Sequence, residues 1–282
     1  VYLATEAILA NGSVEQKEKW LPKLASGEVV GTFALAEGSG RPSAESLNTR
    51  FEAGKLTGKK LPVPDGNIAD FAVIVTKSDT GDGASLALVE LNQEAVIRSS
   101  VRTLDFSRGH ASIEFKGAEA EILGADGSGW SAMESLMDRA AVMFAWEQVG
   151  IADAALEQAR DYAMGRYAFG RAIASYQAIK HKLADMYVKN TLARSNCYYG
   201  AWALNSDSSE LGLAAATARV GAIQASVNAA QENVQTHGGM GFTWEFDCQF
   251  FYRRAKLLSV NIGSEGFWQD KLITAYEQSN VA

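Results

Sequence analysis

Three glycines within four residues, Gly238, Gly239 and Gly241, follow a long alanine-rich helical pattern and make this the stretch best suited to binding a ligand. Glycine adopts positive φ angles without strain, and its lack of a side chain leaves backbone N–H groups open to an anion. The alternative interpretation is an ordinary helix C-cap. His237, beside the first glycine, is more typical of a hydrogen-bonding spacer than of a ligand or a base.

Two cations and two aromatic rings surround a glycine in the run from Arg166 to Arg171, which lies between two predicted helices. An arginine can hold a phosphate through two parallel hydrogen bonds, and Phe169 offers a flat apolar surface. The run therefore indicates a second candidate site for a phosphorylated ligand. The competing interpretation is a helix-capping loop with solvated arginines.

The remaining reactive residue types do not form a recognisable site. The histidines His110, His181 and His237 fall in different parts of the chain, without the spacing of a zinc site, and no Gly-x-Ser-x-Gly motif occurs. We therefore predict no metal centre and no nucleophilic serine. Cys197 and Cys248 are interpreted as small buried apolar residues, which favours a reducing, cytoplasmic compartment.

Composition sets the outer limits on function. The 282 residues are 47% hydrophobic and 21% charged, with a net charge of −7, so the chain can bury a large core and offers no basic face for nucleic acid. No apolar run reaches the roughly 18 residues that span a bilayer. The chain opens at Val1 within a helical pattern, so we expect it to begin inside a longer protein.

The elements that must hold these motifs fall into three zones. Residues 1–28 are helical, with a capping-box pattern at Ser13 and Gln16 and an end signal at Gly27. Residues 29–125 contain short β-branched runs separated by turn residues and predict a β-domain. Residues 126–282 have helical periodicity and predict an antiparallel bundle. The predicted strand runs are 29–35, 71–75, 85–89 and 112–115, and the predicted long helices are 130–164, 175–205, 209–236 and 247–276.

The chain contains four motifs: Arg166-x-x-Phe169-Gly170-Arg171, the helical run 177–186, Gln235-x-x-Gly238-Gly239-x-Gly241-Phe242 and Arg253-Arg254-Ala255-Lys256. In order and spacing they resemble the acyl-CoA dehydrogenase family, and together they are highly specific. The resemblance covers essentially the whole chain and implies an α+β fold: a truncated N-terminal helical domain (1–28), a middle β-domain (29–125) and a C-terminal four-helix bundle (126–282).

The resemblance also implies an FAD bound between subunits. Its flavin ring packs on the β-domain of one subunit, while the bundle of the neighbour contacts the pyrophosphate and adenosine. By resemblance, the residues of this chain that make the second set of contacts are Arg166, Phe169, Gln235, Gly238 and Gly239.

Two flavin-ring contacts of the family are missing from this β-domain. Ala36 replaces the hydroxyl residue of the loop that normally touches flavin and thioester. Pro62 and Pro64 stand where the family commonly has a tryptophan and a hydroxyl residue, and proline neither stacks like tryptophan nor donates a backbone hydrogen bond.

The position of a catalytic base is also unusual. The reaction of the family needs a carboxylate to remove the α-proton of the thioester. One family position for it falls on Ile262, which cannot serve, with Glu265 three residues later. The other falls on Asp138, and the competing interpretation there is a solvated helix face.

These features lead to three hypotheses. The leading one is a subunit of a heteromeric, FAD-dependent acyl-CoA dehydrogenase that desaturates an acyl-CoA thioester, as in the α2β2 bacterial enzymes of steroid side-chain degradation, with a catalytic partner chain. The second is a self-sufficient homo-oligomer using Asp138 or Glu265, and the third is a flavin-free scaffold. By resemblance, electrons leave through an electron-transferring flavoprotein. The acyl group is not specified by the sequence.

Overall fold

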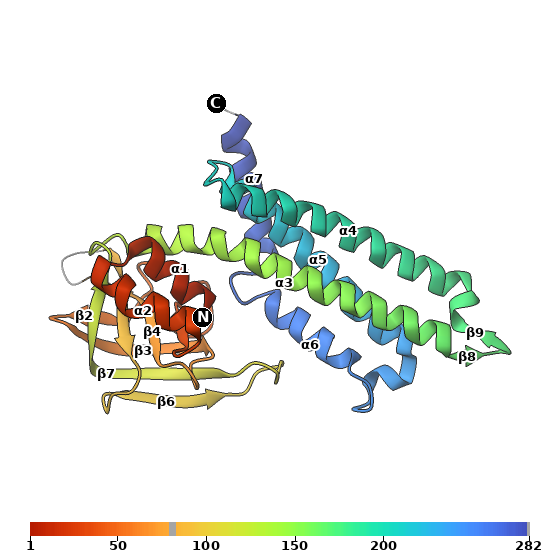
Figure 1. The fold of residues 1–282 in the computed structure, drawn as a ribbon, viewed down its shortest axis with the longest axis horizontal. Coiled ribbons are helices and arrows are strands. Elements are labelled where there is room, and N and C mark those ends of the chain that lie inside the picture. Colours follow the sequence, from red (N-terminus) through yellow and green to blue (C-terminus); the bar gives the residue numbers. More distant parts are fainter. Residues whose placement is uncertain (79–82, 281–282) are drawn as a thin grey trace. The chain divides into compact units, whose positions relative to one another are not determined.

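A computed structural model describes residues 1–78 and 83–280 (Figure 1). By compactness the chain divides into two units, Val1–Leu136 and Met137–Ala282. The three-part division at 28/29 and 125/126 stays a prediction. Within the described residues, no helix combines the length and the apolar character needed to cross a membrane.

The first unit opens with two helices, α1 (Tyr2–Asn11) and α2 (Val14–Ser26). The predicted capping box is confirmed: the backbone N–H of Gln16 donates to the Ser13 hydroxyl at 3.2 Å, and the Gln16 side chain accepts from the Ser13 backbone at 3.1 Å. Gly27 ends α2 in the left-handed conformation, with φ +76°, as its position predicts.

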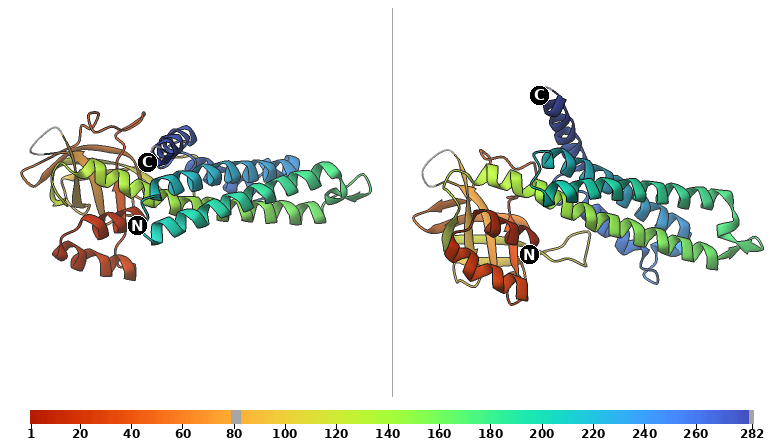
Figure 2. Two further views of the ribbon diagram at one scale, coloured as in Figure 1. Left: turned by 90° about the horizontal axis from the view of Figure 1, so that it is seen from above. Right: turned by 45° about the horizontal axis from the view of Figure 1, so that its top comes forward.

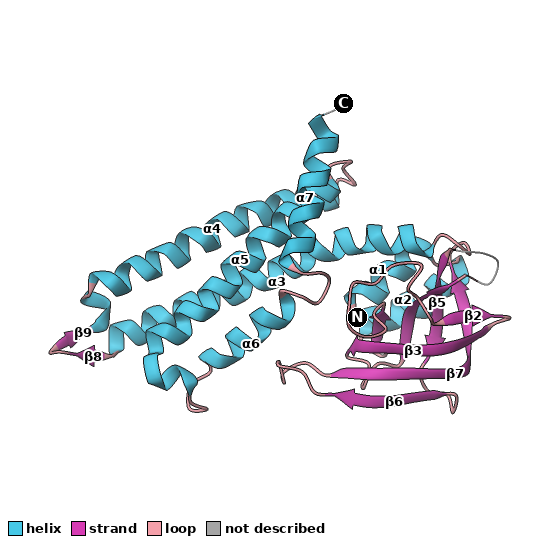
Figure 3. Ribbon diagram, turned by 180° about the vertical axis from the view of Figure 1, so that it is seen from behind, coloured by secondary structure: helices cyan, strands magenta, loops and turns pink. Residues whose placement is uncertain are grey.

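Among the described residues of this unit, seven strands form one sheet (Figure 3). The order is β1-β4-β2-β3-β7-β5, β6 pairs with β7, and β5 also pairs with β4, so the sheet closes on itself around an apolar core. The strands are β1 (Gly31–Ala34), β2 (Arg50–Glu52), β3 (Lys55–Pro64), β4 (Phe71–Lys77), β5 (Ala84–Glu90), β6 (Val96–Val101) and β7 (His110–Leu123).

The two helices pack directly on this sheet. The rings of Trp20 in α2 and Phe71 in β4 lie 4.3 Å apart. A Cβ on Gly31 would lie 2.5 Å from the Phe71 ring and 2.9 Å from Ala4, so the close approach of α1 to β1 requires glycine there.

The four predicted strand runs overlap β1, β4, β5 and β7 and are confirmed. The sequence does not predict β2, β3 or β6. Strand β6 is mostly exposed and polar, and β3 contains a glycine and two prolines, so neither has the apolar alternation typical of a strand. Both strands are defined by antiparallel pairing with β7, which is distant from β3 along the chain and directly follows β6.

The second unit is a helical bundle in which α3, α4 and α5 run side by side (Figures 1 and 2). Helix α5 is the central one, and its alanine side chains pack against α3 and α4. The elements are α3 (Gly129–Gly165), β8 (Tyr167–Ala168), β9 (Arg171–Ala172), the 3-10 turn η1 (Ile173–Ser175), α4 (Gln177–Asn205), α5 (Leu211–His237), the 3-10 turn η2 (Gly238–Phe242), α6 (Cys248–Leu258) and α7 (Glu265–Asn280).

Three of the four predicted long helices match α3, α4 and α5. The fourth, 247–276, is wrong as a single helix, because the chain breaks between α6 and α7. Gly263 has φ +115° at the break. The fully buried guanidinium of Arg219 donates to the backbone oxygen of Leu258 and, at 2.9 Å, to the side chain of Asn261. The first contact satisfies a backbone oxygen at the end of α6 that a continuous helix would bond internally.

Candidate functional site

The first predicted motif forms a short hairpin that projects from the end of the bundle, between α3 and α4 (Figure 1). Arg166 is exposed just after α3, where its N–H donates to the Tyr162 carbonyl at 2.8 Å. In the described part of the chain it has no ion-pair partner. Phe169 and Gly170 form the two-residue turn, with φ of +52° and +81°. Both positive angles identify a type I′ turn.

Phe169 is unusual at this position. A bulky side chain at positive φ is a genuine conformational outlier, and the strain costs about 1–2 kcal/mol. The ring is also 97% exposed, so burial within this chain does not compensate for the strain. Strain of this kind gathers at ligand-binding positions. The rest of the hairpin is well supported, since Tyr176 donates to the Ala168 carbonyl at 3.0 Å and Arg171 lies 4.0 Å from the Tyr176 ring centre.

The second predicted motif ends α5 and forms η2. The Gly238 N–H donates to the backbone oxygen of Gln235, and Gly238 has φ +60° and ψ −135°, a conformation that favours glycine. Gly239 is exposed, and among the described residues nothing lies within 4 Å of a Cβ built there. Gly241 is different: a Cβ would lie 2.5 Å from the Val234 carbonyl oxygen. Gly241 therefore serves packing, whereas Gly239 leaves open surface.

Two aromatic rings bring these motifs together at one end of the bundle. Tyr162 lies one helical turn before Arg166, and His237 directly precedes Gly238. Their rings stack with centroids 4.0 Å apart and an interplanar angle of 27°. Arg166 and the glycine turn, which are about 70 positions apart in the sequence, therefore lie beside a shared contact.

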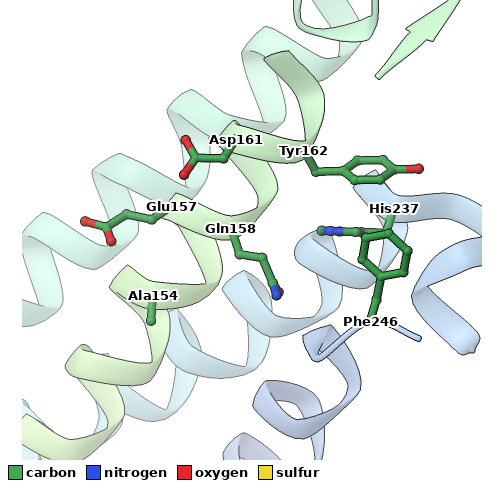
Figure 4. A pocket seen from close by; sticks show the side chains of 7 residues that line it. All are labelled: Ala154, Glu157, Gln158, Asp161, Tyr162, His237 and Phe246. Atoms are coloured by element: carbon green, nitrogen blue, oxygen red, sulfur yellow. The ribbon is translucent and has the colours of Figure 1, made fainter. Parts of the chain in front are cut away.

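A hollow of about 460 Å³ lies beside this contact (Figure 4). The rings of Tyr162, His237 and Phe246 gather on one side of it, while the carboxylates of Glu157 and Asp161 point to the other side. Ala154 and Gln158 complete its lining.

Both candidate bases are engaged by neighbouring side chains. Asp138, in α3, forms an ion pair with Lys271 in α7, and both side chains are largely shielded from solvent. Glu265 is the first residue of α7, and its carboxylate accepts hydrogen bonds from Gln224 at 2.8 Å and Gln269 at 3.0 Å. Ile262 packs against an apolar cluster between the helices.

In the β-domain, the loop that contains Ala36 and Glu37 is held by hydrogen bonds within the domain. Glu37, next to Ala36, accepts from the Lys60 ammonium at 2.8 Å and from the backbone N–H groups of Asn48 and Thr49 at 2.6 and 3.0 Å. Burial lowers the pKa of Lys60 to about 8. Burial raises the pKa of Glu37, but hydrogen bonds from Lys60 and Thr49 outweigh that effect and lower it to about 2.

The two prolines lie in β3, close to this ion pair in sequence. The carbonyl of Pro64 accepts a hydrogen bond from the Thr32 hydroxyl, and Pro62 has no N–H to offer. The Pro64 carbonyl is therefore already hydrogen-bonded within the domain, and Pro62 cannot donate to a ring system.

Sequence reasoning did not find several residues that shape this site. Tyr162 and Phe246 look like ordinary core aromatics in the sequence, and Lys60 and Lys271 look like surface lysines. Only their partners, which lie far away along the chain, distinguish them. Arg219 had one signal, an isolated cation within an alanine-rich helix, and burial lowers its pKa to about 9.

Comparisons with known proteins agree with this architecture. The family model "Acyl-CoA dehydrogenase, C-terminal domain" matches residues 127–273, and the corresponding N-terminal domain model matches residues 1–28. An acyl-CoA dehydrogenase of Bacillus subtilis is 35% identical over 274 residues, which span 93% of this chain and 72% of that protein.

Solved structures show the same fold. Butyryl-CoA dehydrogenase of Megasphaera elsdenii has a TM-score of 0.92 at 24% identity, covering 98% of this chain and 75% of that one. The Tcur3481-Tcur3483 steroid ACAD has a TM-score of 0.87 at 23% identity, covering 99% of this chain and 76% of that one. The expected α+β fold, with its middle β-domain and helical bundle, is confirmed.

Proposed function

Because the chain belongs to the acyl-CoA dehydrogenase family, whose cofactor is FAD, we propose that it is one subunit of a heteromeric enzyme. It supplies the pyrophosphate and adenosine half of an FAD site to a second acyl-CoA dehydrogenase-like chain. That partner holds the flavin ring, the thioester pocket and the base for α,β-desaturation.

The residues at the end of the bundle fit the phosphate side of FAD. Arg166 is exposed and has no ion-pair partner among the described residues, so its guanidinium is open to bind a diphosphate bidentately. Gly238 and Gly239 leave room for close approach of a ligand to the backbone. Phe169 supplies an exposed ring, and Gln235 an exposed amide beside the turn.

The β-domain fits the flavin ring poorly. Pro62 has no backbone N–H to donate, and the Pro64 carbonyl already accepts a hydrogen bond from Thr32. In the loop beside Ala36, the Glu37 carboxylate is already paired with Lys60. One contrast carries the proposal. At the end of the bundle, Arg166 and the glycine turn are exposed and available to a phosphate, whereas in the β-domain the polar groups of the loop beside Ala36 are hydrogen-bonded within the domain.

When bound, FAD supplies the two-electron acceptor of the desaturation. The residues of this chain then have binding roles: Arg166 offsets phosphate charge, the glycine turn offers N–H groups, and Phe169 covers an apolar face of the cofactor. The engagement of Asp138 by Lys271 and of Glu265 by two glutamines favours a base from the partner.

The substrate class under this proposal is an acyl-CoA thioester. The steroid ACAD among the structural neighbours supports a bulky polycyclic acyl group, and the electron acceptor that we propose is an electron-transferring flavoprotein. The rival function is a homo-oligomeric acyl-CoA dehydrogenase in which Asp138 or Glu265 acts as the base.

Co-expression with a candidate partner chain, followed by measurement of the FAD-to-chain ratio, tests the proposal. We expect one FAD per pair of unlike chains, and loss of FAD in the Arg166→Ala variant. Arg160→Ala is the matched control, because Arg160 is an exposed arginine in the last two turns of α3 that pairs with Asp161.

Other outcomes contradict the proposal in distinct ways. One FAD per chain in a catalytically active homomer supports the rival function. A complex that contains no flavin under any condition supports a flavin-free scaffold. Retention of FAD in Arg166→Ala at the wild-type level removes the assigned role of the bundle end.

A further inference from the structure

Two rings from two other segments, Tyr162 and Phe246, meet around the His237 ring. The Tyr162 ring from α3 stacks on it at 4.0 Å, and the Phe246 ring from the segment after η2 contacts it edge-on at 5.4 Å. Tyr162 and Phe246 also meet each other at 5.7 Å and 89° (Figure 4). The imidazole is therefore held from two sides, and only 3% of the residue is exposed.

The imidazole is also hydrogen-bonded to the backbone of its own helix. Its Nδ1 lies 2.9 Å from the backbone oxygen of Asn233, four residues earlier. Because a carbonyl oxygen only accepts, this contact assigns the proton to Nδ1. The His237 side chain thus donates back to the backbone of its own helix, which fixes the orientation of the ring at the end of α5.

A second contact, one turn earlier, joins the same two helices. The Asn233 side-chain amide donates to Gln158 Oε1 in α3 at 2.7 Å. Two contacts, one helical turn apart, therefore join the ends of α3 and α5. The Tyr162–His237 stack is the one nearer the helix ends and lies next to the predicted cofactor residues.

We propose that His237 is a positioning residue that sets the geometry between Arg166 and the Gly238–Gly239 turn. This inference rests on the proposed function, in which both groups bind the pyrophosphate of FAD. The two groups directly follow the ends of different helices, α3 and α5, so their spacing depends on what joins the helix ends. A spacing set before binding reduces the ordering cost of binding and raises affinity.

The test measures the affinity of the co-expressed complex, stripped of flavin, for FAD. Four forms are compared with the wild type: His237→Ala, His237→Phe, Arg166→Ala and the double variant His237→Ala with Arg166→Ala. We expect His237→Ala to weaken FAD binding about tenfold or more, the equivalent of about 1.4 kcal/mol. His237→Phe keeps a stacking ring and stays within about threefold of the wild type.

The double variant separates positioning from general destabilisation. If His237 acts through the placement of Arg166, its substitution costs clearly less FAD affinity once Arg166 is absent. Fully additive effects, or a lower melting temperature of His237→Ala with unchanged FAD affinity, overturn the inference. His237→Phe keeps the test informative if the alanine variant does not fold, because weakening as large as tenfold in that variant also contradicts a role based on stacking.

The two proposals fail in distinguishable ways. Unchanged FAD affinity in Arg166→Ala contradicts the proposed function and this inference together. Weakened binding in Arg166→Ala beside unchanged binding in His237→Ala contradicts this inference alone.

Discussion

The ammonium of Lys60 lies 2.8 Å from the carboxylate of Glu37, and none of the Lys60 side chain is exposed. The ammonium also donates to the Leu35 carbonyl at 3.0 Å. Removing one member of such a pair leaves an uncompensated buried charge, whereas replacing both members by apolar groups is often neutral.

We therefore expect Glu37→Gln to lower the free energy of unfolding by about 3 kcal/mol. Adding Lys60→Met to this variant restores most of the loss. Urea denaturation followed by circular dichroism measures both values. A double variant as unstable as Glu37→Gln alone contradicts the ion-pair explanation.

The same pair predicts a dependence of stability on pH. The pKa of Glu37 is about 2 in the folded chain, below its ordinary value of 4.5, so the folded state holds this proton less tightly than the unfolded state. The stabilisation is complete above about pH 4.5 and is lost as the pH falls toward 2. The stability difference between wild type and Glu37→Gln shrinks across this window. A difference that stays constant from pH 6 to pH 3 contradicts the assignment.

The ion pair of Asp138 with Lys271 predicts a structural rather than catalytic effect of substitution. We expect Asp138→Asn to lower the unfolding free energy by about 1 kcal/mol. In the complex, kcat/KM for an acyl-CoA stays within about twofold of the wild type, since losing a general base costs about 10²-fold or more. A loss of that larger size supports the homo-oligomeric alternative instead. Glu265→Gln provides the same comparison at the other candidate position.

Phe169 predicts a conflict between stability and binding. Phe169→Asn places a residue suited to the type I′ turn, so the unfolding free energy of the chain without flavin rises by about 1 kcal/mol. Affinity for FAD falls at the same time, because the exposed ring is gone. Met164→Ala is the control, as an exposed apolar side chain just before the hairpin. Unchanged FAD affinity in Phe169→Asn contradicts the placement of the cofactor.

Two glycines of the same turn predict opposite effects. Gly241→Ala clashes with the Val234 carbonyl and lowers the unfolding free energy by about 1–3 kcal/mol. Gly239→Ala meets no atom of the described chain, so it leaves stability unchanged but weakens FAD binding. Thermal unfolding without flavin and FAD titration measure the two effects. A destabilised Gly239→Ala with normal FAD affinity contradicts this division.

Local patterns in the sequence predict much of the fold. The capping box at Ser13, the apolar run of β4 and the alanine-rich helices depend on neighbouring residues and are found correctly. The break between α6 and α7 is missed, because it depends on Arg219, which reaches Asn261 from a different helix. Strand β6 is missed for the same kind of reason, since its pairing with β7 rather than its own composition forms it.

In the candidate site, too, residues in local motifs are predicted from the sequence, whereas contacts between distant helices are not. Motif spacing identifies Arg166, Phe169 and the glycine turn as candidates. It contains no information on Tyr162 as the stacking partner of His237, or on Lys271 as the partner of Asp138. Both relationships arise only when distant helices pack together.

The hairpin after α3 is as short as a regular two-residue-turn hairpin with two paired positions allows. Strands β8 and β9 have two residues each and are joined by a two-residue turn. Because the register of a hairpin is fixed by its turn and strand lengths, an inserted residue would shift the β8–β9 pairing and displace the turn that carries Phe169. The length of the hairpin thus determines how far the Phe169 ring extends beyond the bundle. Insertions that other surface loops accept would misdirect the ring here.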